Sequence, residues 1–424
     1  MTKTASPAKA YLAAILIGLL PAWMILLPLD MTSDPDGWQI FLRVNSFAVP
    51  LAQLIFIFLA MGLTFSPFRS IGQLSRITKS ALSLWLLVAA LVSYQAGNDH
   101  LPASIGLFKL AVTGLFFLAL INLRRNFGSR FLLILWASLG VGAVSYVILW
   151  TIHIFLVSPQ DSDWVYRIPG VNNVRHTGHF ALAGLLAGLF CFISFRQSPN
   201  IWLRWVLPLL FSTAGIGLIL WTGSRGPLLA SAVTMFVTFC VAARVRKPIA
   251  GFCIATALAA TTVVAVLPLP HEIYGIAGAT GMADVSAQGE HDASSGRKEL
   301  WTGTMEKITE RPLFGWGINQ FGKFGPSSTS MPLHPHNFPL QFLFSGGIVS
   351  VVLTILIIFP ALRNKKWPYT KGPGAASVAG VIGLLVYSLY DGVLYFSYPT
   401  MLFLVAVASA IAPAPTQRAP DKSG

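Results

Sequence analysis

Charged residues are scarce in this chain of 424 residues. They make up 10% of the sequence, whereas an ordinary soluble domain carries about 25%. Hydrophobic residues account for 54%, and the mean hydropathy is +0.68. This balance excludes a soluble globular protein and predicts an all-α polytopic membrane protein.

Acidic residues and cysteines are also few. The 15 Asp and Glu are outnumbered by 29 Lys and Arg, giving a formal net charge of +14. In a soluble chain this excess would suggest nucleic acid as a partner, but no nucleic-acid-binding motif is visible, and membrane topology explains most of it. Cys191, Cys240 and Cys253 all fall within apolar runs. We therefore expect neither a disulfide framework nor a thiolate metal site.

Apolar runs long enough to cross a bilayer, at about 20 residues each, recur along the chain. The first run, 11–29, is not followed by a small-residue cleavage signal, so we interpret it as a retained span rather than a signal peptide. The sequence predicts twelve spans, near 11–29, 42–65, 80–96, 103–122, 131–157, 179–195, 202–222, 227–243, 249–268, 338–362, 374–393 and 397–412.

The basic residues set the expected orientation of these spans. With both termini in the cytoplasm, most of the 29 Lys and Arg face the cytoplasm, and every acidic residue except Asp421 lies on or near the opposite side. The predicted division of the chain is 1–268 for spans 1 to 9, 269–337 for a periplasmic loop with active-site residues, 338–412 for spans 10 to 12, and 413–424 for a cytoplasmic tail.

Within the predicted periplasmic loop, the segment RKELWTGTMEKITE (297–310) has apolar residues at roughly helical spacing. These residues are Leu300, Trp301, Met305 and Ile308. The pattern predicts an amphipathic helix that lies on the membrane face.

The stretch 311–347 joins this loop to the tenth span. Asn is a preferred helix cap and Pro is tolerated in the first helical turn, so Asn337 and Pro339 predict a helix start. His336 would then lie at the mouth of a membrane helix, with His334 two residues before it. No Asp or Glu occurs in the stretch, which disfavours a catalytic metal there.

Several basic residues do not fit the cytoplasmic side. Arg225 precedes Pro227 at the start of the eighth span, and Arg175 stands beside His176 at the start of the sixth. A cation at a helix N-terminus is unfavourable by about 0.3 to 1 kcal/mol, so these placements suggest a compensating anion such as phosphate. Contact with lipid phosphates explains any one of these residues equally well, but their grouping with the HPHN segment (334–337) favours a specifically bound phosphate. Lys109, deep in a span, has no explanation from the sequence.

The order of three motifs resembles the O-antigen ligase family, within a wider group that includes O-antigen polymerases and O-linked oligosaccharyltransferases. The motifs are SRGPLL (224–229), RKELW (297–301) followed by ERPLFGWGINQF (310–321), and the pair His336-Asn337. The family pattern closes with Gly, Thr or Tyr three residues after Gly347, whereas this chain has Ser350 there.

The resemblance implies the all-helical fold of the C-type glycosyltransferases. It also implies transfer of O-antigen polysaccharide from undecaprenyl pyrophosphate to the lipid A-core oligosaccharide, with the active site on the periplasmic face of the bacterial inner membrane and with no cofactor or metal. By position, His336 corresponds to the essential histidine, and Arg225 and Arg297 to arginines that handle the pyrophosphate. Further candidates for the pyrophosphate are Arg175, Arg167 and Arg311, and Asn337 and His334 are expected to support His336.

The residue chemistry suits such a transfer. A neutral imidazole would take the proton of the attacking sugar hydroxyl, and fixed Arg groups would stabilise the leaving pyrophosphate, with inversion at the anomeric carbon. A polymerase or a protein O-oligosaccharyltransferase would use similar chemistry with another acceptor. A twelve-span transporter is disfavoured because ion coupling needs intramembrane carboxylates, and Asp391, near an outer helix end, is the only candidate.

Overall fold

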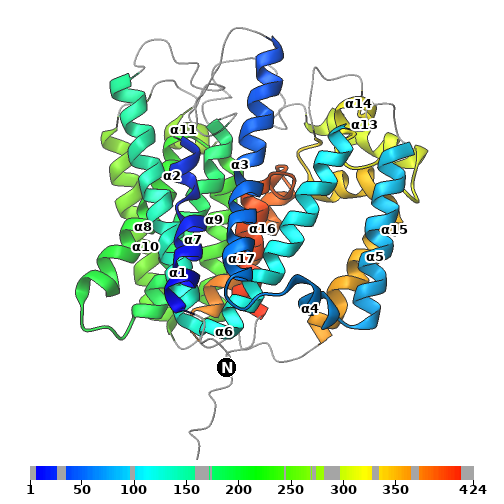
Figure 1. Ribbon diagram of the computed structural model, residues 1–424. Coiled ribbons are helices and arrows are strands. Elements are labelled where there is room, and N and C mark those ends of the chain that lie inside the picture. The colour runs from blue at the N-terminus through cyan, green and yellow to red at the C-terminus, as the bar shows by residue number, and fades with distance from the viewer. Residues whose placement is uncertain are drawn as a thin grey trace, which may run out of the picture.

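The regular elements in the described part of the chain are helices, as the composition predicts (Figure 1). A computed structural model describes residues 6–25, 35–95, 101–157, 171, 174–242, 245–267, 269, 274–280, 297–326, 334–363 and 372–411. Within these ranges, six helices are long and apolar enough to cross a membrane. The chain is therefore an all-α, multi-pass membrane protein.

The helices follow one another with short connections in most of the chain. The first half forms α1 (Pro7–Gly18), α2 (Leu20–Ile25), α3 (Pro35–Met61), α4 (Pro67–Gly72), α5 (Arg76–Gln95), α6 (Leu101–Ile152), α7 (Thr177–Phe195) and α8 (Leu207–Trp221). The second half forms α9 (Arg225–Val241), α10 (Arg246–Val266), α11 (Gly275–Thr280), α13 (Arg297–Glu310), α14 (Phe321–Phe324), α15 (Phe338–Arg363), α16 (Gly374–Ser388) and α17 (Ser397–Ile411).

Each predicted span overlaps at least one of these helices, but the first, fourth, fifth and eleventh predicted ranges differ from the structure. The first range, 11–29, covers parts of two helices, α1 and α2. The fourth and fifth spans form the single element α6, which is interrupted at Gly128, where φ is 70° and ψ is −151°. The eleventh span was predicted to reach residue 393, and this end is wrong, because α16 ends at Ser388. A turn and the 3₁₀ turn Val393–Tyr395 follow, and their apolar residues made the run look continuous. Asp391 consequently lies outside the helix.

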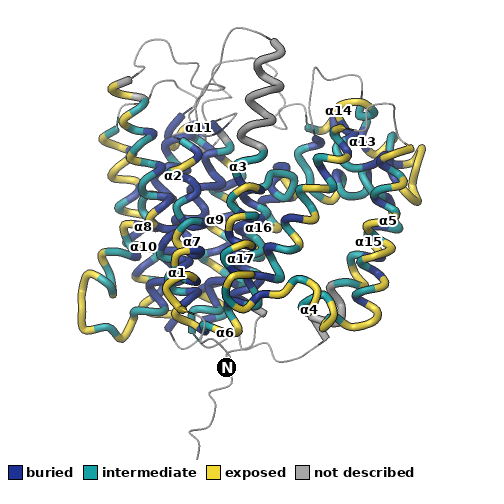
Figure 2. Tube along the Cα trace, in the orientation of Figure 1, coloured by how far each residue is buried: buried dark blue, intermediate teal, exposed yellow. Residues whose placement is uncertain are grey.

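Helix α7 lies at the centre of the bundle. Nearly all of its residues are buried, as expected for a helix that is apolar on every side (Figure 2). It packs closely on α8 because small residues line the contact: a Cβ on Gly184 would meet the Phe211 carbonyl oxygen, and one on Gly215 would meet the Leu185 nitrogen. The N-terminal end of this rigid central helix carries His176 and His179.

A second, smaller core covers α15. Leu300 and Ile308 of α13 are buried with Trp316, Phe321 and Phe344. The helix predicted at 297–310 is therefore confirmed, and one apolar edge of it faces α15, while Met305 is exposed. α5 packs along α15 and exposes its other face (Figure 2). This arrangement holds the segment before α15 between α13 and the end of α16.

Candidate active site

The start of α15 is fixed by Asn337. Its Oδ1 accepts a hydrogen bond from the Leu340 backbone N–H at 3.0 Å, which is the contact expected of a helix cap. Its Nδ2 donates to the Leu389 carbonyl oxygen at 3.0 Å, just beyond the end of α16. The predicted helix start is therefore confirmed, and one side chain joins the beginning of α15 to the end of α16.

The side chain of His336, the residue before this cap, is partly exposed and contacts a buried carboxylate. Its side chain is 35% exposed, and its Nδ1 lies 3.1 Å from Oδ1 of Asp391, whose side chain is only 9% exposed. The backbone of His336 has a φ of 51°, in the left-handed region that non-glycine residues seldom adopt. The fold thus holds the imidazole against a buried carboxylate through an unusual backbone conformation.

The charge state of Asp391 follows from its surroundings. Burial alone would raise the pKa of this carboxyl group, but the hydrogen bond from His336 and the positive charge available on His176, His179 and His336 hold the pKa well below its usual range. Its Oδ1 also accepts the Gly392 backbone N–H at 2.8 Å. An ionised carboxylate only accepts hydrogen bonds, so the neutral ring of His336 carries its proton on Nδ1 and leaves Nε2 without one.

His334 has a different environment, although only one residue separates it from His336. It is buried, with its ring 4.8 Å from that of Tyr395 and 5.1 Å from that of Phe396, measured between centroids. Its Nδ1 accepts the backbone N–H of His336 at 3.1 Å. Burial and the neighbouring His336 charge lower the pKa of His334 well below its ordinary value, and Asp391 only partly offsets this. His334 therefore stays neutral and supports the backbone of its neighbour.

Two further histidines complete the cluster. The rings of His176 and His179 stack with centroids 5.4 Å apart and planes 13° from parallel, and both contact Phe396. His176 precedes α7 and is half-buried, whereas His179 lies in its first turn and is buried. The sequence placed these histidines at the start of a span, and the structure brings them beside the residues that surround Asp391.

Helix α13 anchors the same segment from the other side. Trp301 Nε1 donates to the Pro335 carbonyl oxygen at 2.8 Å, between the two histidines. We name residues 334–337 the histidine segment. It is held by Trp301 of α13, by Asp391 and by the Leu389 carbonyl group, which come from widely separated parts of the sequence.

The predicted arginines divide into groups. Arg225 is the first residue of α9 and is exposed, and its Nε donates to the Gly278 carbonyl oxygen at 3.2 Å. The start of α9 lies close to the start of α7, since a Cβ on Gly178 would meet the ring of Pro227. Arg297 is the half-buried first residue of α13. These two arginines thus begin helices that contribute to the surroundings of the cluster.

The other basic candidates are placed differently. Arg311 follows the end of α13, and its guanidinium carbon lies 4.2 Å from the centroid of the Trp316 ring. Arg167 and the side chain of Arg175 lie outside the described residues. Lys109, which had no explanation from the sequence, has its Nζ 5.2 Å from the Phe47 ring centroid, a favourable cation–π distance.

Helix α15 is interrupted at Gly347, and a loop that follows α13 binds there. At Gly347 the backbone has a φ of 61° and a ψ of −169°. Residues 312–317, which we name the docking loop, form hydrogen bonds with the backbone groups that lose their helical partners at this break. Trp316 N donates to Phe344 O at 2.7 Å, and Gly317 N donates to Ser345 O at 2.9 Å. In the opposite sense, Ile348 N donates to Pro312 O at 2.9 Å. Backbone groups freed by a helix break need such partners, above all in a membrane protein.

In the described part of the chain, no group of three or more His, Cys, Asp and Glu side chains is arranged to hold a metal ion. The pair formed by His336 and Asp391 is suited to proton transfer. A carboxylate fixes one nitrogen of an imidazole, and the other nitrogen is left for a hydroxyl group.

Asp391 and Trp301 are the site residues whose roles sequence reasoning missed. Asp391 was considered only as an unlikely ion-coupling group of a transporter. A better signal was available, because an acidic residue within an apolar run usually has a specific partner. The partner could not be named, since 55 residues separate Asp391 from His336.

Comparisons with known proteins agree with the resemblance. Residues 209–355 match the family model described as O-antigen ligase, a range that includes Arg225, Arg297 and the histidine segment but not Asp391. An O-antigen ligase of Pseudomonas aeruginosa is 30% identical over 224 residues, covering 50% of each chain. A Rickettsia conorii protein named as a proposed polysaccharide ligase is 27% identical over 108 residues, covering 22% of this chain and 26% of its own. The matched segments thus span half or less of these relatives.

Proposed function

The chain belongs to the O-antigen ligase family through its residues 209–355, and from this premise we propose that it transfers a polysaccharide between lipid carriers. The proposed donor is O-antigen linked to undecaprenyl pyrophosphate, and the proposed acceptor is the lipid A-core oligosaccharide. The enzyme is then a glycosyltransferase that needs neither a cofactor nor a metal. The name of the Pseudomonas aeruginosa relative supports a ligase.

The contact between His336 and Asp391 is the observation that carries the proposed mechanism. Asp391 fixes the ring with Nδ1–H toward its carboxylate, so Nε2 accepts the proton of the attacking sugar hydroxyl. The oxygen attacks the anomeric carbon as the bond to the pyrophosphate breaks, which inverts that centre. The carboxylate then stabilises the imidazolium ion, as in other carboxylate–histidine pairs.

The leaving pyrophosphate needs positive charge that is already in place. Arg225 and Arg297 begin helices α9 and α13, where the helix dipole adds to their own charge. A planar guanidinium group can bind two phosphate oxygens at once. These two arginines are assigned to the donor pyrophosphate, with Arg175 and Arg167 as weaker candidates. Stabilising the charge that develops on this group lowers the barrier to transfer.

The proposed topology keeps twelve spans, with both termini in the cytoplasm. A straight helix of 52 residues would measure about 78 Å, more than twice the hydrocarbon thickness of a bilayer, so α6 supplies two spans that meet near Gly128. Residues 1–268 then hold nine spans, 269–337 the periplasmic loop, 338–412 three spans and 413–424 the tail. A cysteine introduced at Ser286 should be labelled from the periplasmic side of the inner membrane.

A polymerase or a protein O-oligosaccharyltransferase would share the donor and the base but use another acceptor. A reconstituted assay with purified lipid-linked glycan separates these functions. The proposal predicts that glycan is transferred to lipid A-core oligosaccharide and not to a second lipid-linked glycan or to a protein hydroxyl group. Transfer only to one of those other acceptors would overturn the assignment as a ligase while keeping the chemistry.

A further inference from the structure

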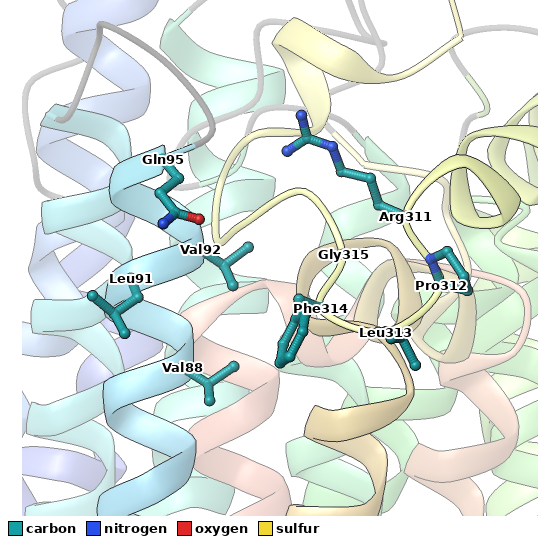
Figure 3. Close-up of a pocket in the computed structure, with 9 residues that line it drawn as sticks. All are labelled: Val88, Leu91, Val92, Gln95, Arg311, Pro312, Leu313, Phe314 and Gly315. Atoms are coloured by element: carbon teal, nitrogen blue, oxygen red, sulfur yellow. The ribbon is translucent and has the colours of Figure 1, made fainter.

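A pocket separate from the histidine segment lies between α5 and the docking loop (Figure 3). Its volume is about 490 Å³. One wall is formed by α5 and the other by the residues that follow α13. The residues that line it are Val88, Leu91, Val92, Gln95, Arg311, Pro312, Leu313, Phe314 and Gly315. The mechanism proposed above does not use this pocket.

The pocket is apolar along most of its length and polar at one end. Val88, Leu91 and Val92 lie on one face of α5, at the spacing of three and four residues that aligns helical side chains. Leu313 and Phe314 provide apolar groups on the other wall. In Figure 3, Gln95 and Arg311 lie at the upper end of the view, and the apolar side chains lie below them. An amphiphilic ligand would match this gradient.

The apolar end continues onto a surface that faces lipid in a membrane protein. α5 is one of the six helices long and apolar enough to cross the bilayer, and few of its residues are buried. Leu91, which lines the pocket, is 51% exposed, and Leu87 is 55% exposed. A lipid chain could therefore enter the pocket sideways from the bilayer.

The polar end carries a cation that the donor site cannot use. Arg297 and Arg311 lie at the first residue of α13 and just past its last residue, and α13 has 14 residues. At about 1.5 Å per residue the two positions are about 20 Å apart, farther than a single pyrophosphate group can reach. The guanidinium carbon of Arg311 lies 4.2 Å from the centroid of the Trp316 ring, a cation–π contact that restricts the position of this side chain. Arg311 is thus held in place for a different anion.

From this geometry we infer that the pocket binds a phosphorylated membrane lipid, with its phosphate at Arg311 and Gln95 and one acyl chain between α5 and Phe314. Charge complementarity selects the phosphate, because Arg311 is the only charged side chain of the lining. The apolar wall selects the chain. The lipid is an additional ligand, distinct from the donor held at Arg225 and Arg297, and its binding does not depend on the proposed transfer reaction.

Photolabelling of the full-length protein tests this inference directly. The protein is placed in nanodiscs of phosphatidylcholine that contain a trace of phosphatidylglycerol with a photoreactive group on its acyl chain. Labelled peptides are then identified by mass spectrometry. Label is expected in 76–95 and in 311–315, and photoreactive phosphatidylcholine at the same concentration should label these peptides several-fold less.

Arg311→Gln should lower the labelling by phosphatidylglycerol about tenfold, since hydrogen bonds to charged groups are the strong ones in such a site. Lys323→Gln is the matched control, because Lys323 is also an exposed cation over an aromatic ring, 5.2 Å from the Phe324 centroid, but does not line the pocket. Val92→Trp, which fills the groove, should also reduce labelling, whereas Leu87→Trp on the same helix should not.

Three results would overturn the inference. Unchanged labelling of Arg311→Gln would show that Arg311 does not bind the phosphate. Equal labelling by the two lipids would show that the pocket does not select for charge. Displacement of the label by a small molar excess of undecaprenyl pyrophosphate would assign the pocket to the donor instead. Because none of these readouts involves glycan transfer, they leave the proposed function to be judged by its own experiment.

Discussion

Two segments that precede α15 in the sequence are attached to that helix by different kinds of contact. The histidine segment (334–337) is held mainly by side chains: His336 contacts Asp391, Asn337 caps the helix, and His334 accepts a backbone N–H. The docking loop (312–317) is held mainly by backbone hydrogen bonds to the helix around Gly347. One segment meets the start of α15, and the other meets its break.

This difference indicates that the histidine segment carries the proposed chemistry and that the docking loop supports the fold. In the histidine segment the identity of each side chain decides what the site can do, since only an imidazole can both contact Asp391 and accept a proton. In the docking loop the backbone conformation decides the fit, and Gly315 has a φ of 70° with no room for a Cβ beside the Phe344 carbonyl oxygen. Substitutions should therefore reduce the rate in the first segment and the stability in the second.

The largest effect is expected for His336→Ala. Removing a positioned general base typically costs about 10² to 10⁴ in rate, so the variant should insert and fold normally yet transfer little glycan. The comparison is with His334→Ala, which should be milder because His334 supports the backbone. Glycan transfer is measured in membranes at matched protein levels. Equal losses in the two variants would remove the distinction between base and support.

Gly347→Ala should have the largest effect on stability. Its backbone angles fall in a region that essentially only glycine adopts, at a cost of about 1 to 3 kcal/mol for other residues, and the new Cβ would meet the Leu313 carbonyl oxygen. Gly114→Ala is the control, since Gly114 lies in helix α6 and a Cβ there would meet no atom within 4 Å. Thermal unfolding in detergent should show a clear loss for Gly347→Ala alone, and similar losses would argue against the docking loop as a support.

Arg225→Lys should weaken donor binding about tenfold without unfolding the protein. A lysine keeps the charge but loses the planar fork that binds two phosphate oxygens, and it also loses the Nε contact with Gly278. The affinity for a lipid pyrophosphate is the quantity to measure. Arg246→Lys serves as the control, because Arg246 begins α10, away from the histidine segment, and contacts the Cys240 carbonyl group. Unchanged affinity in Arg225→Lys would favour contact with lipid headgroups.

The smallest effect concerns the pH dependence of stability. Burial lowers the pKa of His334 well below its ordinary value, so the folded protein leaves this ring neutral while the unfolded chain takes up a proton near pH 6.5. Stability should therefore fall as the pH drops below about 6.5. His334→Gln should flatten this part of the thermal-unfolding curve against pH. A slope that is identical in the variant would show that His334 is not the group responsible.

The sequence predicted the helices and the start of α15 because those features are local. Apolar run length locates a span, and Asn337 with Pro339 identifies a helix start without any knowledge of the fold. The predicted end of the eleventh span, at residue 393, was wrong because the apolar residues after Ser388 form turns, which run length alone does not reveal. The contact of His336 with Asp391 and that of Trp301 with Pro335 join distant parts of the chain, and helical periodicity carries no information about them.

The dependence of the transfer rate on pH tests the central claim most directly. The rate is measured in a reconstituted system for the wild type, His336→Ala and Asp391→Asn, with EDTA present throughout. Asp391 should remain ionised across the range, because its pKa is held well below the usual value, so loss of activity toward acid should report protonation of an imidazole. The account predicts a wild-type rate that falls toward acid, a low and nearly flat rate for His336→Ala, and a strongly reduced rate for Asp391→Asn. Near-normal turnover by His336→Ala, or activity that EDTA abolishes and a divalent ion restores, would contradict it.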